Sequence, residues 1–168
     1  MGVSGCGKTT IGRLLAQRLG CEFIEGDAYH PQANVDKMAR GEPLTDQDRA
    51  PWLATLRARI ESALNAPAPR AVLACSALKR AYRRTLVGAD DRRFAIIHLT
   101  APPELLRHRM QSRQGHFMPA TMLDSQLAIL EPPEPDSGSP TRTLDVSSSP
   151  NNVVDAAANW LASLTSTR

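Results

Sequence analysis

The residues of this chain that could perform chemistry begin at its second position, with the string Gly2-Val3-Ser4-Gly5-Cys6-Gly7-Lys8-Thr9. The string fits G-x-x-x-x-G-K-[ST] at every fixed position, which predicts a P-loop. Glycines permit the backbone dihedrals that turn successive N–H groups toward phosphate oxygens, and the following helix directs its positive dipole end at the same anion. Lys8 would reach the β- and γ-phosphates, and the Thr9 hydroxyl would ligate Mg²⁺. We therefore expect ATP to bind from Gly2 through Thr10, the alternative being a glycine-rich turn that binds nothing.

A second polar segment, Gly26-Asp27-Ala28-Tyr29-His30-Pro31, follows the predicted strand Cys21–Glu25. Ligands of open α/β sheets bind at the carboxyl ends of the strands. A carboxylate at this position could accept the proton of an acceptor hydroxyl, or hold Mg²⁺ through water. Asp27 is therefore the candidate base, and the alternative is an aspartate that only caps a helix. No carboxylate ends the predicted strand Ala71–Cys75, so Mg²⁺ would depend on Thr9, phosphates, water and Asp27.

Several uncommon strings follow the P-loop. They are Gly26-Asp-x-x-His30-Pro31, Asn34, Lys37-Met38, Gly41-Glu-Pro-Leu44, Asp46-x-Asp48-Arg49-x-Pro51-Trp52-Leu53, Cys75-Ser76-Ala77-Leu78-Lys79, Tyr82-Arg83, Gly115-His116-Phe117-Met118, Leu123-x-Ser125-Gln126 and Leu130-Glu131-Pro132. Together they resemble the acceptor half of gluconokinases. The resemblance runs from Gly2 to about Pro132. It implies a nucleoside-monophosphate-kinase-like fold, ATP and Mg²⁺ as cosubstrates, D-gluconate as acceptor, 6-phospho-D-gluconate as product, a homodimer, and His116 in the substrate site. Gln114 departs from the family, which commonly has a basic residue there.

Gluconate presents one carboxylate and a row of hydroxyls, so its site needs a cation and several hydrogen-bond partners. Arg49 could grip the carboxylate with its planar guanidinium. Lys79, His30 and Ser76 are further candidates. Each has a plain structural alternative: Arg49 would be a solvated helix residue, and Lys79 an ordinary lysine on a helix surface.

Two arginines, Arg109 and Arg113, flank a predicted lid at Gln114–Pro119. Lid arginines that close over the γ-phosphate stabilise its developing charge and exclude water. The alternative for both is a basic helix face.

The elements that must position these residues alternate between helical periodicity and short apolar runs. This alternation predicts a three-layer α/β fold, with a parallel sheet flanked by helices in a single domain over residues 1–168 and a lid at about 113–120. Expected helices are Lys8–Leu19, His30–Arg40, Thr45–Ala66, Ala77–Val87, Pro102–Arg113, Ala120–Leu130 and Asn152–Leu164. Expected strands are Cys21–Glu25, Ala71–Cys75, Phe94–Thr100 and Thr143–Val146.

No apolar run precedes Gly2, although a P-loop normally follows a buried central strand. We therefore expect the first strand of the sheet to be missing from this chain. The two neighbouring strands would then carry unpaired backbone groups, each costing about 1–3 kcal/mol where buried.

Composition excludes several classes of protein. The 168 residues carry a formal net charge of +3, with seven aromatic residues (two Trp, two Tyr and three Phe). Nucleic-acid binding would call for a basic stripe with stacking aromatics. No apolar run approaches the ~20 residues of a membrane span and no signal peptide is evident, so we expect a cytoplasmic protein. The remaining alternatives are another small-molecule kinase of this fold, such as a shikimate or nucleotide kinase, and a nucleotide-binding module without turnover.

Overall fold

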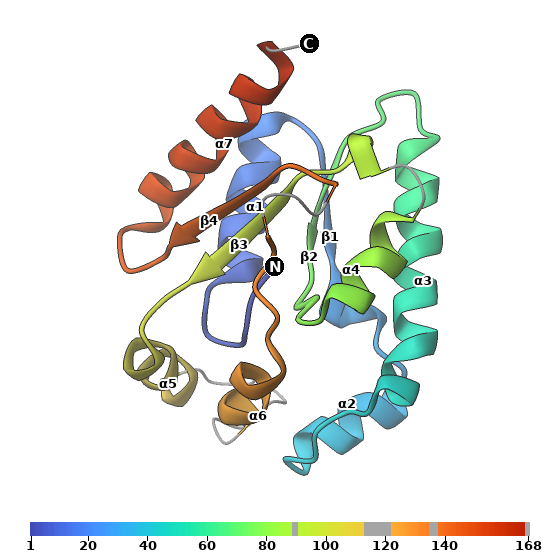
Figure 1. The fold of residues 1–168 in the computed structure, drawn as a ribbon, viewed down its shortest axis with the longest axis vertical. Helices are drawn as coiled ribbons and strands as arrows, with labels where there is room; N and C mark the ends of the chain where they lie inside the picture. The colour runs from blue at the N-terminus through green and yellow to red at the C-terminus, as the bar shows by residue number, and fades with distance from the viewer. Residues whose placement is uncertain (89–90, 113–121, 135–137, 167–168) are drawn as a thin grey trace.

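The architecture is that of parallel strands covered by helices on both faces, in a computed structural model that describes residues 1–88, 91–112, 122–134 and 138–166 (Figure 1). The strands are β1 (Glu22–Glu25), β2 (Ala71–Ala74), β3 (Ile96–Thr100) and β4 (Thr141–Asp145). The α-helices are α1 (Lys8–Leu19), α2 (Gln32–Ala39), α3 (Asp46–Leu64), α4 (Arg80–Val87), α5 (Pro103–Gln111), α6 (Met122–Ile129) and α7 (Pro150–Ser166), and 3₁₀ turns cover η1 (Gly26–Tyr29) and η2 (Asp91–Arg93). The predicted α/β fold is confirmed.

Each face of the β1–β2 pair has its own hydrophobic core, because successive side chains of a strand point to opposite faces. Val72 packs against the core that contains Ile11 and Leu15 of α1, with α7 beside it. Leu73 packs against the core formed by Trp52, Leu56 and Ile60 of α3. Helices α2, α5 and α6 lie at the end of the molecule where the strands finish (Figure 1).

Local signals in the sequence fix the two helices that matter most for the site. Helix α1 lies between Gly7 and Gly20, both in the left-handed region, and the Gly20 N–H satisfies carbonyls of the last turn. Helix α3 begins at a capping box in which the Thr45 side chain accepts from the Asp48 N–H and the Asp48 carboxylate accepts from the Thr45 N–H.

The four strands form two separate parallel pairs, β1–β2 and β3–β4. Within the described residues, the backbone hydrogen bonds that join the two pairs are those of Met1 and Gly2. The Met1 amino group donates to Ile97 O at 2.6 Å, Leu99 N–H donates to Met1 O at 2.9 Å, and Gly2 N–H donates to Ser76 O at 3.2 Å. These bonds follow the pattern of a parallel ladder, so Met1 and Gly2 occupy the position of a strand between β2 and β3.

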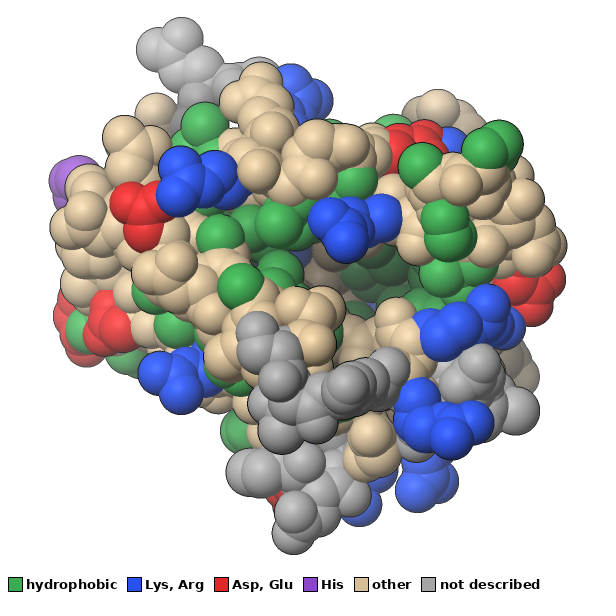
Figure 2. All heavy atoms as spheres, turned by 90° about the horizontal axis from the view of Figure 1, so that it is seen from above, with side chains coloured by type: hydrophobic (Ala, Val, Ile, Leu, Met, Phe, Trp, Pro, Cys, Tyr) green, Lys and Arg blue, Asp and Glu red, His purple; other side chains and the backbone are tan. Residues whose placement is uncertain are grey.

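A cavity of about 1110 Å³ continues from Met1 between the two pairs. Its lining includes Val72 and Ala74 of β2, Ile97 and Leu99 of β3, and Ile11 of α1. Figure 2 shows a hollow in the top face, with hydrophobic side chains inside and Lys or Arg side chains beside it. The cavity runs along the strands instead of lying at their carboxyl ends, so it is not the candidate site.

Candidate active site

The P-loop has the backbone that phosphate binding requires. Gly2, Gly5 and Gly7 have φ values of 144°, 82° and 84°, in the region that favours glycine. A Cβ on Gly2 would lie 2.6 Å from Leu99 O, and one on Gly5 would lie 2.8 Å from Leu106 O. The loop is therefore packed closely against the end of β3 and the middle of α5, and its shape depends on glycine at both positions.

Two side chains form hydrogen bonds with the backbone of the P-loop, one from the loop itself and one from α6. Lys8 Nζ donates to Val3 O at 3.2 Å, so the lysine folds back over its own loop. Ser4 N–H donates to Gln126 Oε1 of α6 at 2.7 Å. Thr9 and Thr10 follow in the first turn of α1, whose N-terminal dipole favours an anion at this point. The geometry of the loop therefore fits a bound phosphate chain.

The turn η1 places Asp27 beside the end of β2. A Cβ on Gly26 would lie 2.5 Å from Ala74 O, so only glycine lets the chain approach β2 this closely. Trp52, which is 1% exposed, donates from Nε1 to Gly26 O at 2.8 Å and ties the turn to α3. Burial raises the pKa of Cys75 to about 12, and the negative charge of Asp27 adds to the rise, which places this carboxylate near the strand end.

His30 closes the same turn. Its ring stacks on Trp52 with centroids 4.1 Å apart and planes inclined by 13°. Burial lowers the pKa of His30 to about 4, although the nearby Asp27 charge opposes the shift. The histidine is therefore neutral at physiological pH.

A second polar cluster surrounds the ring of Tyr82. Arg49 and Lys79 lie over this ring at 5.5 and 5.6 Å from its centroid. Lys79 Nζ donates to both Asp46 carboxylate oxygens, at 2.8 and 3.0 Å, and the Tyr82 hydroxyl also donates to Asp46. Arg49 donates to Leu44 O. Two cationic side chains thus lie over one aromatic ring, and the Asp46 carboxylate accepts hydrogen bonds from both Lys79 and Tyr82. The cluster therefore presents positive charge to an anionic ligand.

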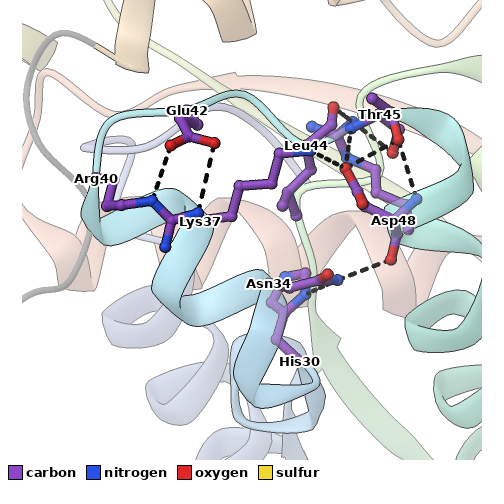
Figure 3. A network of polar contacts seen from close by, with 9 residues as sticks. His30, Asn34, Lys37, Arg40, Glu42, Leu44, Thr45 and Asp48 are labelled. Atoms are coloured by element: carbon purple, nitrogen blue, oxygen red, sulfur yellow. Dashed lines mark hydrogen bonds and ion pairs between the residues drawn. The ribbon is translucent and has the colours of Figure 1, made fainter.

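The connection between α2 and α3 is held by Asp48 (Figure 3). Lys37 Nζ donates to Asp48 Oδ2 at 2.7 Å, and the same oxygen accepts from Thr45. These bonds, that from Lys37 first, lower the pKa of Asp48 to about 2. Asn34 Nδ2 donates to Asp48 O at 2.8 Å and lies 3.5 Å from His30 Nδ1. This network fixes α2 to the start of α3, and with it the turn that carries His30.

The remaining candidates divide into those that the structure places and those outside the described residues. Ser76 follows β2, and its backbone carbonyl accepts a hydrogen bond from the Gly2 N–H. The next residue, Ala77, has a φ of 44°. Such strain in a non-glycine residue is frequent at functional sites. Arg109 donates to Val146 O at 2.8 Å at the end of β4. Arg113 and His116, together with the predicted lid, lie outside the described residues.

Comparison with known proteins agrees with this arrangement. A family profile described as "AAA domain" matches residues 1–133. Gluconokinase of Gluconobacter oxydans (strain 621H) is 54% identical over 136 residues, covering 81% of this chain and 75% of that protein. The thermosensitive gluconokinase of Escherichia coli (strain K12) is 44% identical over 137 residues, covering 81% of this chain and 72% of that protein.

The chain belongs to the gluconokinase family. A solved gluconokinase from Sinorhizobium meliloti 1021 superposes with a TM-score of 0.85 at 42% identity, covering 99% of this chain and 91% of that structure. Shikimate kinase from Acinetobacter baumannii superposes with a TM-score of 0.57 at 18% identity, covering 96% and 91% of the two chains, and this likeness shows the fold alone.

A magnesium ion at the P-loop would find few protein ligands. Within the described residues, no group of three or more His, Cys, Asp or Glu side chains could hold a metal ion. The hydroxyl of Thr9 and the carboxylate of Asp27 are the protein groups that could hold such an ion, and phosphate and water oxygens would have to supply its other ligands. Over the same residues, no helix is long and apolar enough to cross a membrane.

Sequence reasoning assigned no role in the candidate site to three residues that support it, Asp46, Tyr82 and Trp52. All three appeared in the sequence analysis only as parts of the strings shared with gluconokinases. Their contacts span 36 residues for Tyr82 with Asp46 and 26 residues for Trp52 with Gly26. The available signal was that polar-tipped aromatics are usually hydrogen-bonded when buried.

Proposed function

We infer that this protein is an ATP-dependent gluconokinase, which transfers the γ-phosphoryl group of ATP to a hydroxyl of D-gluconate and releases 6-phospho-D-gluconate. The observation that carries the inference is the arrangement at the carboxyl ends of the strands. There the P-loop, the Asp27 turn after β1, and the Arg49–Lys79–Tyr82 cluster around the start of α4 form one edge of the molecule. The likeness to shikimate kinase extends to the fold alone, which does not favour that acceptor.

The P-loop supplies most of the binding energy for ATP. Its backbone N–H groups and the N-terminus of α1 hold the phosphate oxygens, and Lys8 exchanges its bond with Val3 O for oxygens of the β- and γ-phosphates. Mg²⁺, when bound, neutralises charge on the transferring group, with Thr9 as its protein ligand. Phosphoryl transfer needs little covalent chemistry from the protein, so placement and charge compensation dominate.

The acceptor side binds the gluconate and takes up one proton. Arg49 grips the gluconate carboxylate, because a planar guanidinium matches a carboxylate in two hydrogen bonds. Lys79, His30 and Ser76 contact the hydroxyls. Asp27 accepts the proton of the attacking hydroxyl, since it lies on the turn that follows β1 beside the P-loop edge.

The lid residues complete the site in this proposal. Arg109, Arg113 and His116 close over the γ-phosphate and the substrate and exclude water, which would otherwise hydrolyse ATP. The resemblance to gluconokinases supports these three assignments. It also supports a homodimer in the cytoplasm, for which light scattering on purified protein is the direct test of assembly.

Coupled ADP release tests the proposal. ATP and Mg²⁺ are supplied with D-gluconate, with shikimate, with nucleoside monophosphates, or with no acceptor. We expect release that depends on gluconate alone. Binding of ATP without release in any of these reactions would replace the kinase with a nucleotide-binding module.

A further inference from the structure

The ring of His30 is fixed by a residue that is itself immobilised. His30 stacks on Trp52, with ring centroids 4.1 Å apart. Trp52 is buried to 1% exposure and donates to Gly26 O at 2.8 Å, so it is bound to the same turn that His30 closes. The tryptophan therefore covers one face of the imidazole and sets the plane of the ring.

Asn34 determines which imidazole nitrogen carries the proton. Its side chain is 5% exposed, and its Nδ2 donates to Asp48 O at 2.8 Å. A carbonyl oxygen only accepts hydrogen bonds, so the amide must present its nitrogen here and not its oxygen. The same Nδ2 lies 3.5 Å from His30 Nδ1. An NH₂ group has two hydrogens to donate, so a hydrogen bond between these two atoms requires Nδ1 as the acceptor and the ring proton on Nε2.

The contact with Asn34 also leaves the ring with a single donor. Because Nδ1 accepts from Asn34, it carries no proton, so the ring is the neutral form with its N–H at Nε2. Among the described residues, none hydrogen-bonds Nε2, so this N–H is the group that a ligand would meet.

We propose that Asn34 and Trp52 are positioning residues that hold His30 as a neutral Nε2–H donor to an oxygen of the polyhydroxy acid substrate. This inference rests on the proposed function. In this proposal His30 and Asp27 have different roles. His30 binds a substrate oxygen without taking up a proton, because its Nδ1 accepts a hydrogen bond from Asn34. Asp27 is left as the proton acceptor of the turn.

A measurement independent of activity tests the tautomer. Two-bond ¹H–¹⁵N correlation spectra of the imidazoles, with His30→Asn used to assign the His30 signals, report the protonated nitrogen and its titration. We expect the Nε2–H tautomer from pH 6 to 8. An Nδ1–H tautomer would overturn the proposal.

Two substitutions at His30 separate the nitrogens in kinetics. The amide nitrogen of Gln overlies Nε2, and that of Asn overlies Nδ1. His30→Gln should keep the gluconate KM within about 3-fold of wild type, whereas His30→Asn should raise it about 3- to 10-fold, the effect of one neutral hydrogen bond. The KM for ATP should not change in either variant. Equal effects of His30→Gln and His30→Asn on the gluconate KM would contradict the role of His30 Nε2–H as a donor to the substrate.

The positioning role of Asn34 has its own readout. Asn34→Asp replaces the donor at Nδ1 by an acceptor, so we expect the ring proton to move to Nδ1 in the spectra and the gluconate KM to rise. The matched control is Asn151→Asp on the exposed surface of α7, which should change neither. Unchanged spectra in folded Asn34→Asp protein would remove Asn34 from the proposal. A wild-type protein with the expected tautomer and no gluconate turnover would refute the proposed function and leave the ring geometry standing.

Discussion

An extended apolar segment fused in front of Met1 should stabilise this protein markedly. Met1 already forms ladder bonds with Ile97 and Leu99. The side of β3 that faces β4 is used by Ile96, whose N–H donates to Pro140 O. Backbone groups alternate along a strand, so Ala95 O and Ile97 N–H face the cavity. Continuing the chain two residues back from Met1 would bring a peptide N–H and C=O to these two groups.

The size of the effect follows from three contributions. Attaching a residue removes the buried ammonium of Met1, whose pKa is lowered by burial from 8.0 to about 6. That shift costs the 168-residue chain about 1.4 kcal/mol at pH 7. Three buried Val or Ile side chains and the new ladder bonds contribute about 10 kcal/mol, and ordering five residues costs about 7 kcal/mol. The net gain is about 4 kcal/mol, or roughly 10–15 °C in Tm for a domain of this size.

Thermal unfolding measured by circular dichroism is the assay, with three proteins compared: the 168-residue chain, a Val/Ile-rich five-residue extension, and a Gly/Ser extension of equal length. The Gly/Ser extension also removes the buried ammonium of Met1. It should therefore raise the free energy of unfolding only by the smaller, electrostatic contribution. The ammonium penalty exists below pH 8 and is complete below pH 6. The unextended chain should therefore gain stability between pH 6 and 8, while the extended ones do not. Equal Tm values for the two extensions would refute the reasoning.

The other predictions concern the proposed site and the histidines. Lys8→Ala should lower kcat at least about 100-fold with an unchanged circular dichroism spectrum, because its charge acts on the transferring group; a modest loss would contradict this role. Asp27→Asn should lower kcat by about 10²–10⁴-fold, the range for a general base, and near-full activity would make Asp27 a structural residue. Arg49→Ala should raise the gluconate KM about 10-fold or more in initial-rate assays, since a charged hydrogen bond is lost, and an unchanged KM would remove Arg49 from the site. His98, 4% exposed, has its pKa lowered by burial from 6.5 to about 4. The unfolded chain therefore binds this proton first, and stability should fall as pH drops from 6.5 through 4. Urea titrations should show a shallower fall in His98→Gln, and parallel curves would assign the acid sensitivity elsewhere.

Local sequence predicted the bounds of those helices whose ends have recognisable capping residues. The bounds of α1 were predicted to the residue because glycines flank it on both sides, and α3 started where the Thr45 capping box begins. Helix α4 was predicted from Ala77 but begins at Arg80. The difference arises because Ala77 takes a positive φ and Lys79 is extended, and nothing in the local string signals either conformation.

The sequence predicted the P-loop backbone but not the contacts that support the other candidate residues. Arg49 and Lys79 both lie over the ring of Tyr82, and their ligand roles stay a prediction. The pairing of Lys79 with Asp46 connects residues 33 positions apart. Such a contact depends on how α3 packs against α4, which periodicity along either helix does not specify.

The complete burial of Cys6 gives the P-loop a built-in chemical reporter. Cys6 has no exposed surface, and its Sγ would lie 2.8 Å from a Cβ on Gly2, so a thiol reagent reaches it only when the loop leaves its packed position. Cys21, which is partly exposed, reacts without such opening and serves as an internal standard. The labelling rate of Cys6 relative to Cys21, read by mass spectrometry, thus measures how often the loop opens, and how far a bound nucleotide suppresses that opening, in unmodified protein.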